Sequence, residues 1–277
     1  MDLGLAGRAC VVTGGSRGIG LETARQLIAE GANVLLVARH EDALRDAVAA
    51  CASRDGEPAG RGAAAGRGEA AWLGLDITDP EAAERAAAEC VARFGSFDVL
   101  VNNAGGSVSR SLPDLTDQDW RWDWEINVMA PMRLMRAAVP RMARRGWGRV
   151  VNVSSSSGKR PGQRNASYAV AKSAQLSLSR AYADFYARHG VLINAVTPGP
   201  VAGELWLEPG GLADQAARMR QTTREEVLRD MAAALPIGRL ATPREIASVI
   251  VFLCSERASN VTGAAWSVDG GAVPVII

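Results

Sequence analysis

Two side chains that can exchange protons, Tyr168 and Lys172, stand four residues apart in a stretch expected to be helical from about Ala166. Side chains at this spacing share one face of a helix, with Cβ atoms about 5–6 Å apart, so an ammonium lies beside a phenol. The pair is therefore a candidate for holding a phenolate near neutral pH. The alternative is an ordinary exposed pair, because Tyr-x-x-x-Lys often arises by chance.

The charge of one lysine supplies most, but not all, of the energy that an acidic phenol requires. Lowering a tyrosine pKa from about 10 to near neutrality takes about 4 kcal/mol, and an ammonium about 5.5 Å away supplies about 3 kcal/mol at an effective dielectric constant of about 20. A second positive charge should therefore lie nearby. An oxidised nicotinamide ring would supply it.

The helix follows a strand and a run of serines. Residues 149–153 are mostly β-branched, as in a buried strand, and residues 154–157 are all serine. Gly158, Pro161 and Gly162 then indicate a chain reversal before the helix begins. The serines are thus expected in a loop between a core strand and the helix that carries Tyr168.

A glycine-rich turn lies near the start of the chain. Residues 8–13 form an apolar strand, Gly14, Gly18 and Gly20 follow, and apolar residues then recur at helical spacing over residues 21–28. Glycines between a strand and a helix N-terminus let backbone amides approach a pyrophosphate, which the helix dipole also favours. The spacing differs from the commoner dinucleotide fingerprint. We expect phosphate binding here; the alternative is a turn that needs glycine for packing.

The end of the second strand, residues 33–38, indicates which dinucleotide is bound. Enzymes for the non-phosphorylated cofactor usually place Asp or Glu there to hold the ribose 2′-hydroxyl, yet this chain has Ala38 and then Arg39. Together with Arg17 of the glycine turn, two guanidinium groups could converge on a 2′-phosphate. We therefore predict a preference for NADP(H), with NAD(H) as the alternative if both arginines are merely solvated.

Further strands and helices alternate along the first half of the chain. A helix over residues 41–52 precedes a Gly-, Ala- and Arg-rich surface loop over residues 53–69, whose arginines are expected to be solvated, and then a strand over residues 71–75. Asp76 could accept a hydrogen bond from an adenine amino group with Ile77 against the ring, or it could stabilise a turn. Asp79 is expected to cap the next helix ahead of Pro80.

Small polar residues follow the fourth strand, residues 97–101, where the sheet edge should open. A long helix over residues 117–145 then carries three tryptophans at alternate positions, so some are expected in the core and some against another subunit. Pro131 should bend this helix or break its hydrogen-bond ladder. Asn127 reads most simply as a buried amide that satisfies backbone groups.

The second half of the chain contains a segment that is expected to cover the site. An apolar strand over residues 191–196 closes on Pro198 and Gly199, and a helix over residues 243–255 and a strand over residues 264–268 end the chain. Residues 200–240 are too short for a second domain. We expect them to form a flap of short helices, with apolar residues 205–207 towards a pocket or packed in the lid, and with arginines on a solvated face.

Composition excludes several classes of protein. A chain of 277 residues that is 48% hydrophobic can bury one large core, and its net charge of +1 gives no reason to expect nucleic acid or an anionic membrane as partner. The start of the chain lacks the basic region and long apolar segment of a secretory signal, and no apolar run is long enough to cross a bilayer. We expect a cytoplasmic protein whose four widely spaced cysteines are reduced and bind no metal.

Taken in order, these pieces resemble the short-chain dehydrogenase/reductase family over essentially the whole chain. The matching residues are Thr13, Gly14, Gly18, Ile19, Gly20, Asn102, Asn103, Ala104, Gly105, Asn127, Ser155, Tyr168, Lys172, Pro198, Gly199, Asp269, Gly270 and Gly271. The resemblance implies one domain over residues 1–277 with a Rossmann fold, a doubly wound parallel sheet of about seven strands flanked by helices. It also implies a homotetramer or homodimer.

The resemblance further implies the roles of four catalytic residues. Tyr168 would pass a proton to or from the substrate oxygen while hydride moves at the nicotinamide, and Lys172 would lower the tyrosine pKa and bind the nicotinamide ribose. Ser155 would orient the substrate, and Asn127 would hold a water for proton relay to Lys172. With the residues argued above, the expected cofactor contacts are Gly14, Ser16, Arg17, Gly18, Ile19, Gly20, Arg39, Asp76, Ile77, Asn103, Ala104, Gly105, Tyr168, Lys172, Pro198, Gly199 and Val201.

One position departs from the family's pattern. Members commonly carry a threonine shortly after the Pro-Gly turn to hold the nicotinamide carboxamide, whereas Gly203 stands here, and backbone groups of Val201 could substitute. The expected function is hydride transfer between NADP(H) and a carbonyl or secondary alcohol. A 3-oxoacyl thioester, a sugar, a steroid or a polyketide ketone would each fit as substrate. The alternative is a non-catalytic dinucleotide-binding sensor or structural subunit.

Overall fold

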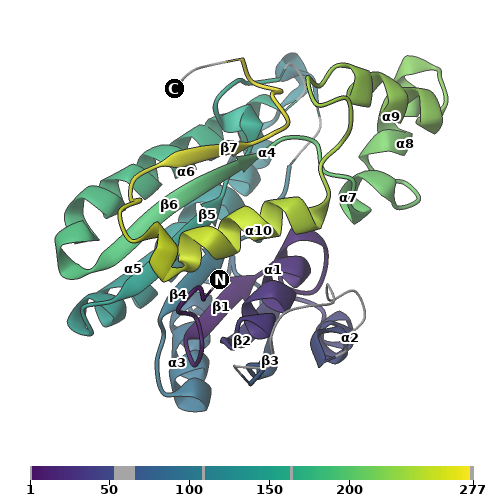
Figure 1. Ribbon diagram of the computed structural model, residues 1–277. Coiled ribbons are helices and arrows are strands. Elements are labelled where there is room, and N and C mark those ends of the chain that lie inside the picture. Colours follow the sequence, from purple (N-terminus) through teal and green to yellow (C-terminus); the bar gives the residue numbers. More distant parts are fainter. Residues whose placement is uncertain (1, 53–65, 108–109, 163–164, 275–277) are drawn as a thin grey trace.

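The computed structural model describes residues 2–52, 66–107, 110–162 and 165–274. Within these residues, seven strands form one sheet in the order β3-β2-β1-β4-β5-β6-β7, and all neighbouring strands are parallel (Figure 1). The strands are β1 (Ala9–Thr13), β2 (Asn33–Ala38), β3 (Ala70–Gly74), β4 (Val99–Asn102), β5 (Gly148–Val153), β6 (Val191–Pro198) and β7 (Ala265–Val268). The predicted fold class, a doubly wound parallel Rossmann sheet, is confirmed.

The central strands are short and rich in apolar residues, and β1 and β5 are buried along their whole length. Strands of this kind belong to parallel sheets covered by helices on both faces. Two hydrophobic clusters lie on the two faces of the sheet. Their helices are α3 (Ala82–Phe94), α5 (Ala130–Arg144) and α6 (Ala166–Tyr186) on one face, and α1 (Gly18–Ala29), α2 (Glu41–Ala52) and α10 (Pro243–Cys254) on the other.

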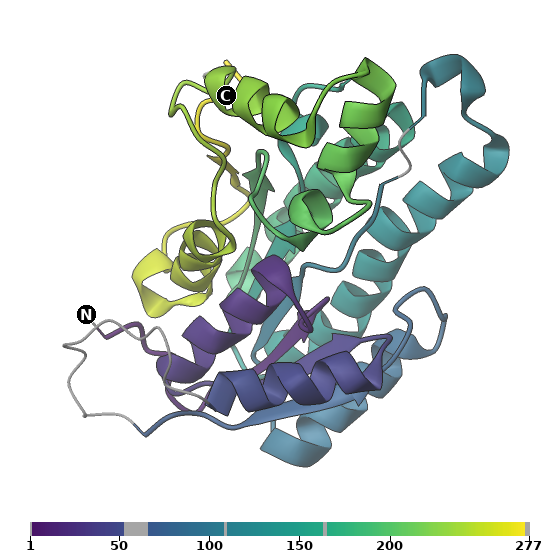
Figure 2. The ribbon, with the colours of Figure 1, turned by 90° about the vertical axis from the view of Figure 1, so that its right-hand side faces the viewer.

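The strand order reverses between β1 and β4, because β2 and β3 lie on one side of β1 and the later strands on the other. In open parallel sheets, ligands bind outside the carboxyl ends of the strands at this switch point. Three helices gather at that end of the molecule in both views (Figure 1, Figure 2). They are α7 (Glu204–Leu207), α8 (Leu212–Arg220) and α9 (Arg224–Ala233).

The helix predicted over residues 117–145 is interrupted close to Pro131. α4 (Asp117–Trp124) and α5 are joined by a π-helical turn, η2 (Glu125–Met129), and Pro131 lies in the first turn of α5. Proline cannot donate the backbone hydrogen bond that a regular helix requires, so the predicted break in the ladder is confirmed. Such wide turns are frequent at functional sites, and this one carries Asn127.

The expectation that some tryptophans of α4 are core residues is wrong. Trp120, Trp122 and Trp124 are 36%, 42% and 44% exposed, whereas Asp123 between them is fully buried. Trp122 packs over Gly106, where a Cβ atom would lie 2.2 Å from the edge of the indole ring. Sequence periodicity therefore identified neither the buried face of α4 nor its buried carboxylate. Contact of the tryptophans with another subunit stays a prediction.

Two further details differ from the sequence-based expectations. The third helix begins at Ala82 instead of Pro80, and the Asp79 carboxylate accepts a hydrogen bond from the Glu81 amide at 2.9 Å in the turn before it. Most of the expected loop over residues 53–69, including two of its arginines, lies outside the described residues. Arg67 is not simply solvated, because its guanidinium donates to the Cys51 carbonyl at 2.8 Å.

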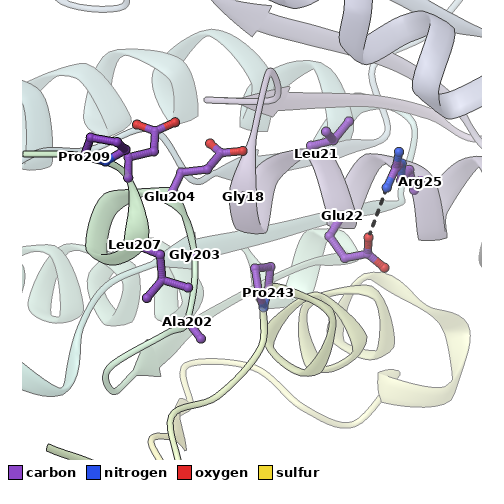
Figure 3. A pocket seen from close by; sticks show the side chains of 11 residues that line it. Gly18, Leu21, Glu22, Arg25, Ala202, Gly203, Glu204, Leu207, Pro209 and Pro243 are labelled. Carbon is purple, nitrogen blue, oxygen red and sulfur yellow. Dashed lines mark ion pairs between the residues drawn. The ribbon is translucent and has the colours of Figure 1, made fainter. Parts of the chain in front are cut away.

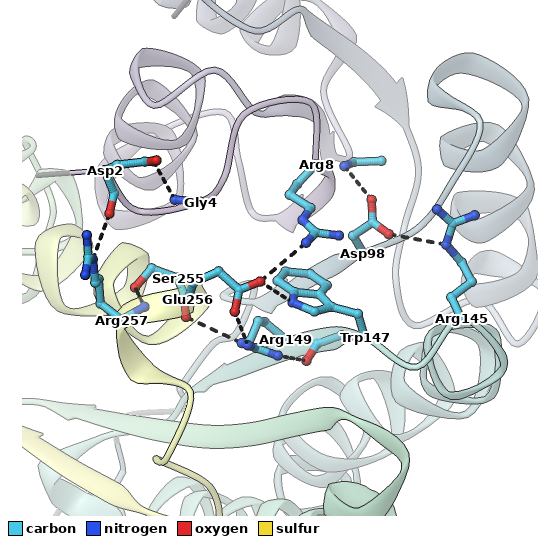
Figure 4. A network of polar contacts seen from close by, with 12 residues as sticks. Asp2, Gly4, Arg8, Asp98, Arg145, Trp147, Arg149, Ser255, Glu256 and Arg257 are labelled. Carbon is cyan, nitrogen blue, oxygen red and sulfur yellow. Dashed lines mark hydrogen bonds and ion pairs between the residues drawn. The ribbon is translucent and has the colours of Figure 1, made fainter.

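A polar network holds together the end of the sheet opposite α7, α8 and α9 (Figure 4). The Trp147 ring lies between two guanidinium groups, with Arg8 3.6 Å and Arg149 4.4 Å from its centre. The Glu256 carboxylate accepts from the indole at 2.6 Å and from both arginines at 3.4 and 3.3 Å. These contacts join the amino ends of β1 and β5 to the segment after α10.

No helix among the described residues combines the length and the apolar character that a bilayer span requires.

Candidate active site

The site is built where the carboxyl ends of β1 and β4 meet. The Thr13 hydroxyl accepts hydrogen bonds from the amides of Asn103 and Ala104, both at 3.0 Å. The Asn103 side-chain amide donates in return to the carbonyls of Thr13 and Gly14, at 2.9 and 3.2 Å. These four bonds fix the glycine turn against the end of β4. They also show that Asn103 supports the predicted cofactor site through the protein backbone.

The glycine turn has the shape that a phosphate needs. Gly14 and Gly18 have positive φ angles of 64° and 55°, and a Cβ at Gly20 would lie 2.2 Å from the Gly14 carbonyl oxygen. A Cβ at Gly18 would meet no described atom within 4 Å, so the space outside this residue is open. No described side chain caps the α1 N-terminus, and its first turn carries no acidic residue. Its backbone amides are therefore available to bind an anion. Ser16 lies just before α1 in the glycine turn, and Ile19 lies in the first turn of α1.

The loop after β5 brings one serine to the Tyr168 phenol. The Ser155 hydroxyl hydrogen-bonds the phenol and accepts from the Ser157 amide at 3.1 Å. Ser154 is turned to another task, because its buried hydroxyl donates to the Lys172 carbonyl at 3.0 Å. The structure thus selects Ser155 from the run of four serines. The sequence alone could place this residue only by its distance along the chain from Tyr168.

Lys172 is held deep in the site. Its ammonium nitrogen donates to the Val153 carbonyl at 2.8 Å and to the Gln175 side-chain oxygen at 3.2 Å, and lies 5.6 Å from the centre of the Tyr168 ring. Only 3% of Lys172 is exposed.

Burial dominates the electrostatics of the pair. Tyr168 is half-buried, and desolvation raises its pKa to about 12, although the Ser155 hydrogen bond lowers the pKa and the Asp123 charge raises it further. Desolvation also lowers the pKa of Lys172 to about 7, against the opposing effect of Asp123. The expectation that Lys172 alone brings the phenol most of the way to neutrality is therefore wrong for the protein's own residues. The Coulomb estimate counted the attraction of two charges and omitted the cost of burying them.

The side chain of Asn127 lies near Lys172, on the other side of the space beside Gly105. Its side-chain amide donates to the carbonyls of Gly106 and Asp123, both at 2.9 Å, so the expected role of satisfying backbone groups is confirmed. Its side-chain oxygen is buried and accepts no hydrogen bond from a described residue. A Cβ at Gly105 would lie 2.9 Å from that oxygen and 3.4 Å from the Lys172 nitrogen. Glycine at position 105 therefore keeps the space between these two polar atoms open.

Asp123 is a site residue that the sequence reasoning missed. It is fully buried, accepts a short hydrogen bond from the Ser167 hydroxyl, and its charge acts on both Tyr168 and Lys172. The available signal was its position four residues before Asn127, which places both on one helix face. The signal was overlooked because α4 has the sequence of an exposed polar helix, in which a buried carboxylate is not expected.

The residues predicted to contact the adenosine end of the cofactor come from separate segments of the chain. Arg17 and Arg39 are both exposed, at the start of α1 and after β2. The Asp76 carboxylate accepts from the Thr78 amide at 3.0 Å, which with the Thr78 hydroxyl and the Arg39 charge lowers its pKa. The structure therefore shows the turn-stabilising role of Asp76. Ile77 is 7% exposed and packs in the hydrophobic core, and contact of either residue with adenine stays a prediction.

The segment after β6 is positioned by close packing. Gly199 is required where it stands, because a Cβ there would lie 2.8 Å from the Asp269 carbonyl oxygen. Pro198 ends β6, and Val201 pairs with Ala241 in an isolated parallel bridge. At Gly203 a Cβ would meet only Pro243, at 3.7 Å. Packing thus leaves room for a Cβ atom at position 203, and the carboxamide contact of Val201 stays a prediction.

The flap borders a cavity beside the glycine turn (Figure 3). The cavity has a volume of about 540 Å³ and lies between α1 and α7, with Gly18 and Leu207 among its lining residues. Tyr168 does not line it, so the cavity adjoins the phosphate end of the site and not the phenol. Among the flap arginines, Arg224 is not on a solvated face as expected, because it pairs with Asp214 at 3.5 Å and donates to the Leu207 carbonyl.

Known proteins resemble this chain along nearly its whole length. The family described as enoyl-(acyl carrier protein) reductase matches residues 14–273. The short-chain reductase protein NovJ of Streptomyces niveus is 36% identical over 94% of this chain and 92% of its own length. The cis-4-hydroxycyclohexanecarboxylate dehydrogenase of Sinomonas cyclohexanicum is 38% identical over 98% of both chains. The L-sorbose reductase of Gluconobacter frateurii, solved with NADPH and L-sorbose, covers 100% of both chains with a TM-score of 0.89 and 32% identity.

The buried lysine makes protein stability depend on pH in a predictable direction. Between about pH 7 and about pH 10 the unfolded chain keeps the proton of Lys172 that the folded protein has released, so the free energy of unfolding rises with pH. The Lys172→Met variant lacks this titration. We expect the unfolding free energy of the wild type, relative to the variant, to rise from about pH 6.5 to about pH 9. Urea unfolding at both pH values measures it. A difference that stays constant or falls would contradict the low pKa of Lys172.

Proposed function

The chain belongs to the short-chain dehydrogenase/reductase family, and we propose that it transfers hydride between NADP(H) and a carbonyl or secondary alcohol, with Tyr168 as the general acid or base. The observation that carries the proposal is the hydrogen bond between Ser155 and Tyr168 beside the buried Lys172. A protein that only bound a dinucleotide would not need these three side chains together. The bound dinucleotide supplies the hydride chemistry, and the protein supplies position and charge.

The chain's own residues divide the handling of the proton among them. Tyr168 holds the proton that passes to or from the substrate oxygen. Ser155 orients that oxygen beside the Tyr168 hydroxyl. Lys172 carries the nearest positive charge, and its low pKa lets it release a proton near neutral pH. The open space at Gly105 suits a water between the Asn127 oxygen and Lys172, because both atoms can bind it. That water would link Lys172 to further proton carriers.

The preference for NADP(H) is supported by charge at the adenosine end. Arg17 and Arg39 are both exposed, and Ala38 and Arg39 stand at the end of β2 where a carboxylate would hold a ribose 2′-hydroxyl. The related L-sorbose reductase was solved with NADPH. The glycine turn fits a pyrophosphate through its open cradle at Gly18.

We propose the remaining properties of the protein from the same features. The chain forms one dinucleotide-binding domain, and residues 200–240 act as a flap over the substrate. Phe185 and Val170 of α6 are 61% and 46% exposed, which supports burial of this helix in a homotetramer or homodimer. All four cysteines are free and buried, which supports a reducing compartment such as the cytoplasm. The substrate is a ketone or alcohol of the sugar, 3-oxoacyl, steroid or polyketide classes.

Removal of the phenol hydroxyl tests the catalytic assignment. Tyr168→Phe should lose about 10²-fold or more of turnover, the scale of general acid–base catalysis, with little change in the Kd for NADPH. Oxidation of NADPH with a panel of ketones and acyl thioesters measures turnover and narrows the substrate class. Tyr182→Phe, on the same helix but packed against the core, is the matched control and should keep its activity. Near-normal turnover in Tyr168→Phe would refute the role of this residue.

Removal of both guanidinium groups tests the choice of cofactor. The Arg17→Ala, Arg39→Ala double variant should lose about tenfold or more of its kcat/KM preference for NADPH over NADH, because charge-assisted bonds to the 2′-phosphate are lost. Arg229→Ala removes an exposed flap arginine and should leave the preference unchanged. If the double variant keeps the full preference for NADPH, the assignment of these arginines is wrong.

A further inference from the structure

The guanidinium group of Arg17 is engaged by the flap. Its Nε lies 3.6 Å from a Glu204 carboxylate oxygen, and its NH1 donates to Glu208 at 3.4 Å. Glu204 begins the short helix α7 and Glu208 directly follows its end, and both are far from Arg17 in the sequence. The sequence assigns this arginine to a phosphate, yet the structure gives it two carboxylate partners. One group therefore has two competing tasks at the entrance to the site.

We propose that Glu204 and Glu208 set the specificity for the cofactor by competing with its 2′-phosphate for Arg17, so that binding of a phosphorylated dinucleotide releases α7 from the glycine turn. This inference rests on the proposed function, because it needs a dinucleotide in the cradle. It assigns a role to two flap carboxylates that lie outside the catalytic set.

The two ion pairs are weak enough to be exchanged. The side chains of Arg17, Glu204 and Glu208 are 62%, 44% and 53% exposed, and ion pairs in contact with solvent contribute little stability. The Glu204 oxygen that faces Arg17 accepts no hydrogen bond from a described residue, so this contact is not well formed. A phosphate binds a guanidinium through paired, charge-assisted hydrogen bonds and carries more charge than a carboxylate. It should therefore displace the glutamates, at a modest cost in affinity.

Glycines flank α7 on both sides. α7 contains four residues, begins after Gly203 in extended conformation, and is followed by Gly210, whose φ is 79°. Figure 3 shows Glu204 extending from the flap towards Gly18, across the cavity between α7 and α1. On the side that faces α1, the cavity leaves open space beside α7. Arg224 still holds the Leu207 carbonyl on the other side, so the release concerns only the contact of α7 with the glycine turn.

Calorimetric binding of NADP⁺ and NAD⁺ to the Glu204→Gln, Glu208→Gln double variant tests the exchange. Loss of both charges should tighten NADP⁺ binding about three- to tenfold, the scale of weak surface ion pairs, and change NAD⁺ binding less than about twofold. In the Arg17→Ala background the same two substitutions should have no such effect. Glu22→Gln is the matched control, because Glu22 lines the same cavity but has other partners: its carboxylate accepts from Gln26 at 3.3 Å and lies 3.9 Å from Arg25.

Four results would overturn the exchange. They are unchanged or weaker NADP⁺ binding in the double variant, an equal gain for NAD⁺, a gain of the same size in Glu22→Gln, and a gain that survives removal of Arg17. An equal gain for both dinucleotides would mean that α7 only obstructs the cradle. If the wild type bound neither dinucleotide, both the proposed function and the exchange would be refuted. If the wild type bound NADP⁺ and the double variant bound it equally well, only the exchange would be refuted.

Discussion

Burial of two ionisable groups side by side is the constraint on which the site depends. The surroundings of Tyr168 and Lys172 favour the neutral form of each, which raises the pKa of the phenol to about 12 and lowers that of the ammonium to about 7. Burial thus brings the pKa of the lysine close to neutral pH but moves that of the phenol further from it. The buried carboxylate of Asp123 supports the charge on Lys172 and opposes that on the phenolate. The pair therefore requires additional positive charge at the phenol before it becomes an effective acid and base.

The fold supplies this environment from separate parts of the chain. β5 ends at Val153, whose carbonyl accepts from Lys172, and the next turn carries Ser155 to the phenol. The π-helical turn between α4 and α5 places Asn127 with a free oxygen opposite Gly105. The switch in strand order then sets the glycine turn beside the end of β4. Each element carries one part of the site, and the order of strands in the sheet brings the parts together.

Much of this arrangement could be predicted from sequence because it depends on local patterns. Buried strands, the glycine turn, the spacing of Tyr168 and Lys172, and the break near Pro131 all follow from neighbouring residues. The direction of the phenol pKa could not, since desolvation depends on the packing around the ring. Asp123 was missed because its burial depends on how α4 lies against α6, and Arg17 has flap partners that only the folded chain brings near. The errors are thus concentrated where long-range contacts decide the environment of a charge.

The most direct test of this account is the pKa of the Tyr168 phenol, followed by NMR with ring-labelled tyrosine before and after addition of NADP⁺. The chain has only three tyrosines, so comparison with Tyr168→Phe assigns the signal. In the protein alone the phenol should titrate near 12, above the ordinary value for tyrosine, and its pKa should fall when the oxidised dinucleotide binds. A phenol that titrates below the ordinary value without the dinucleotide, or whose pKa does not change when NADP⁺ binds, would contradict the account.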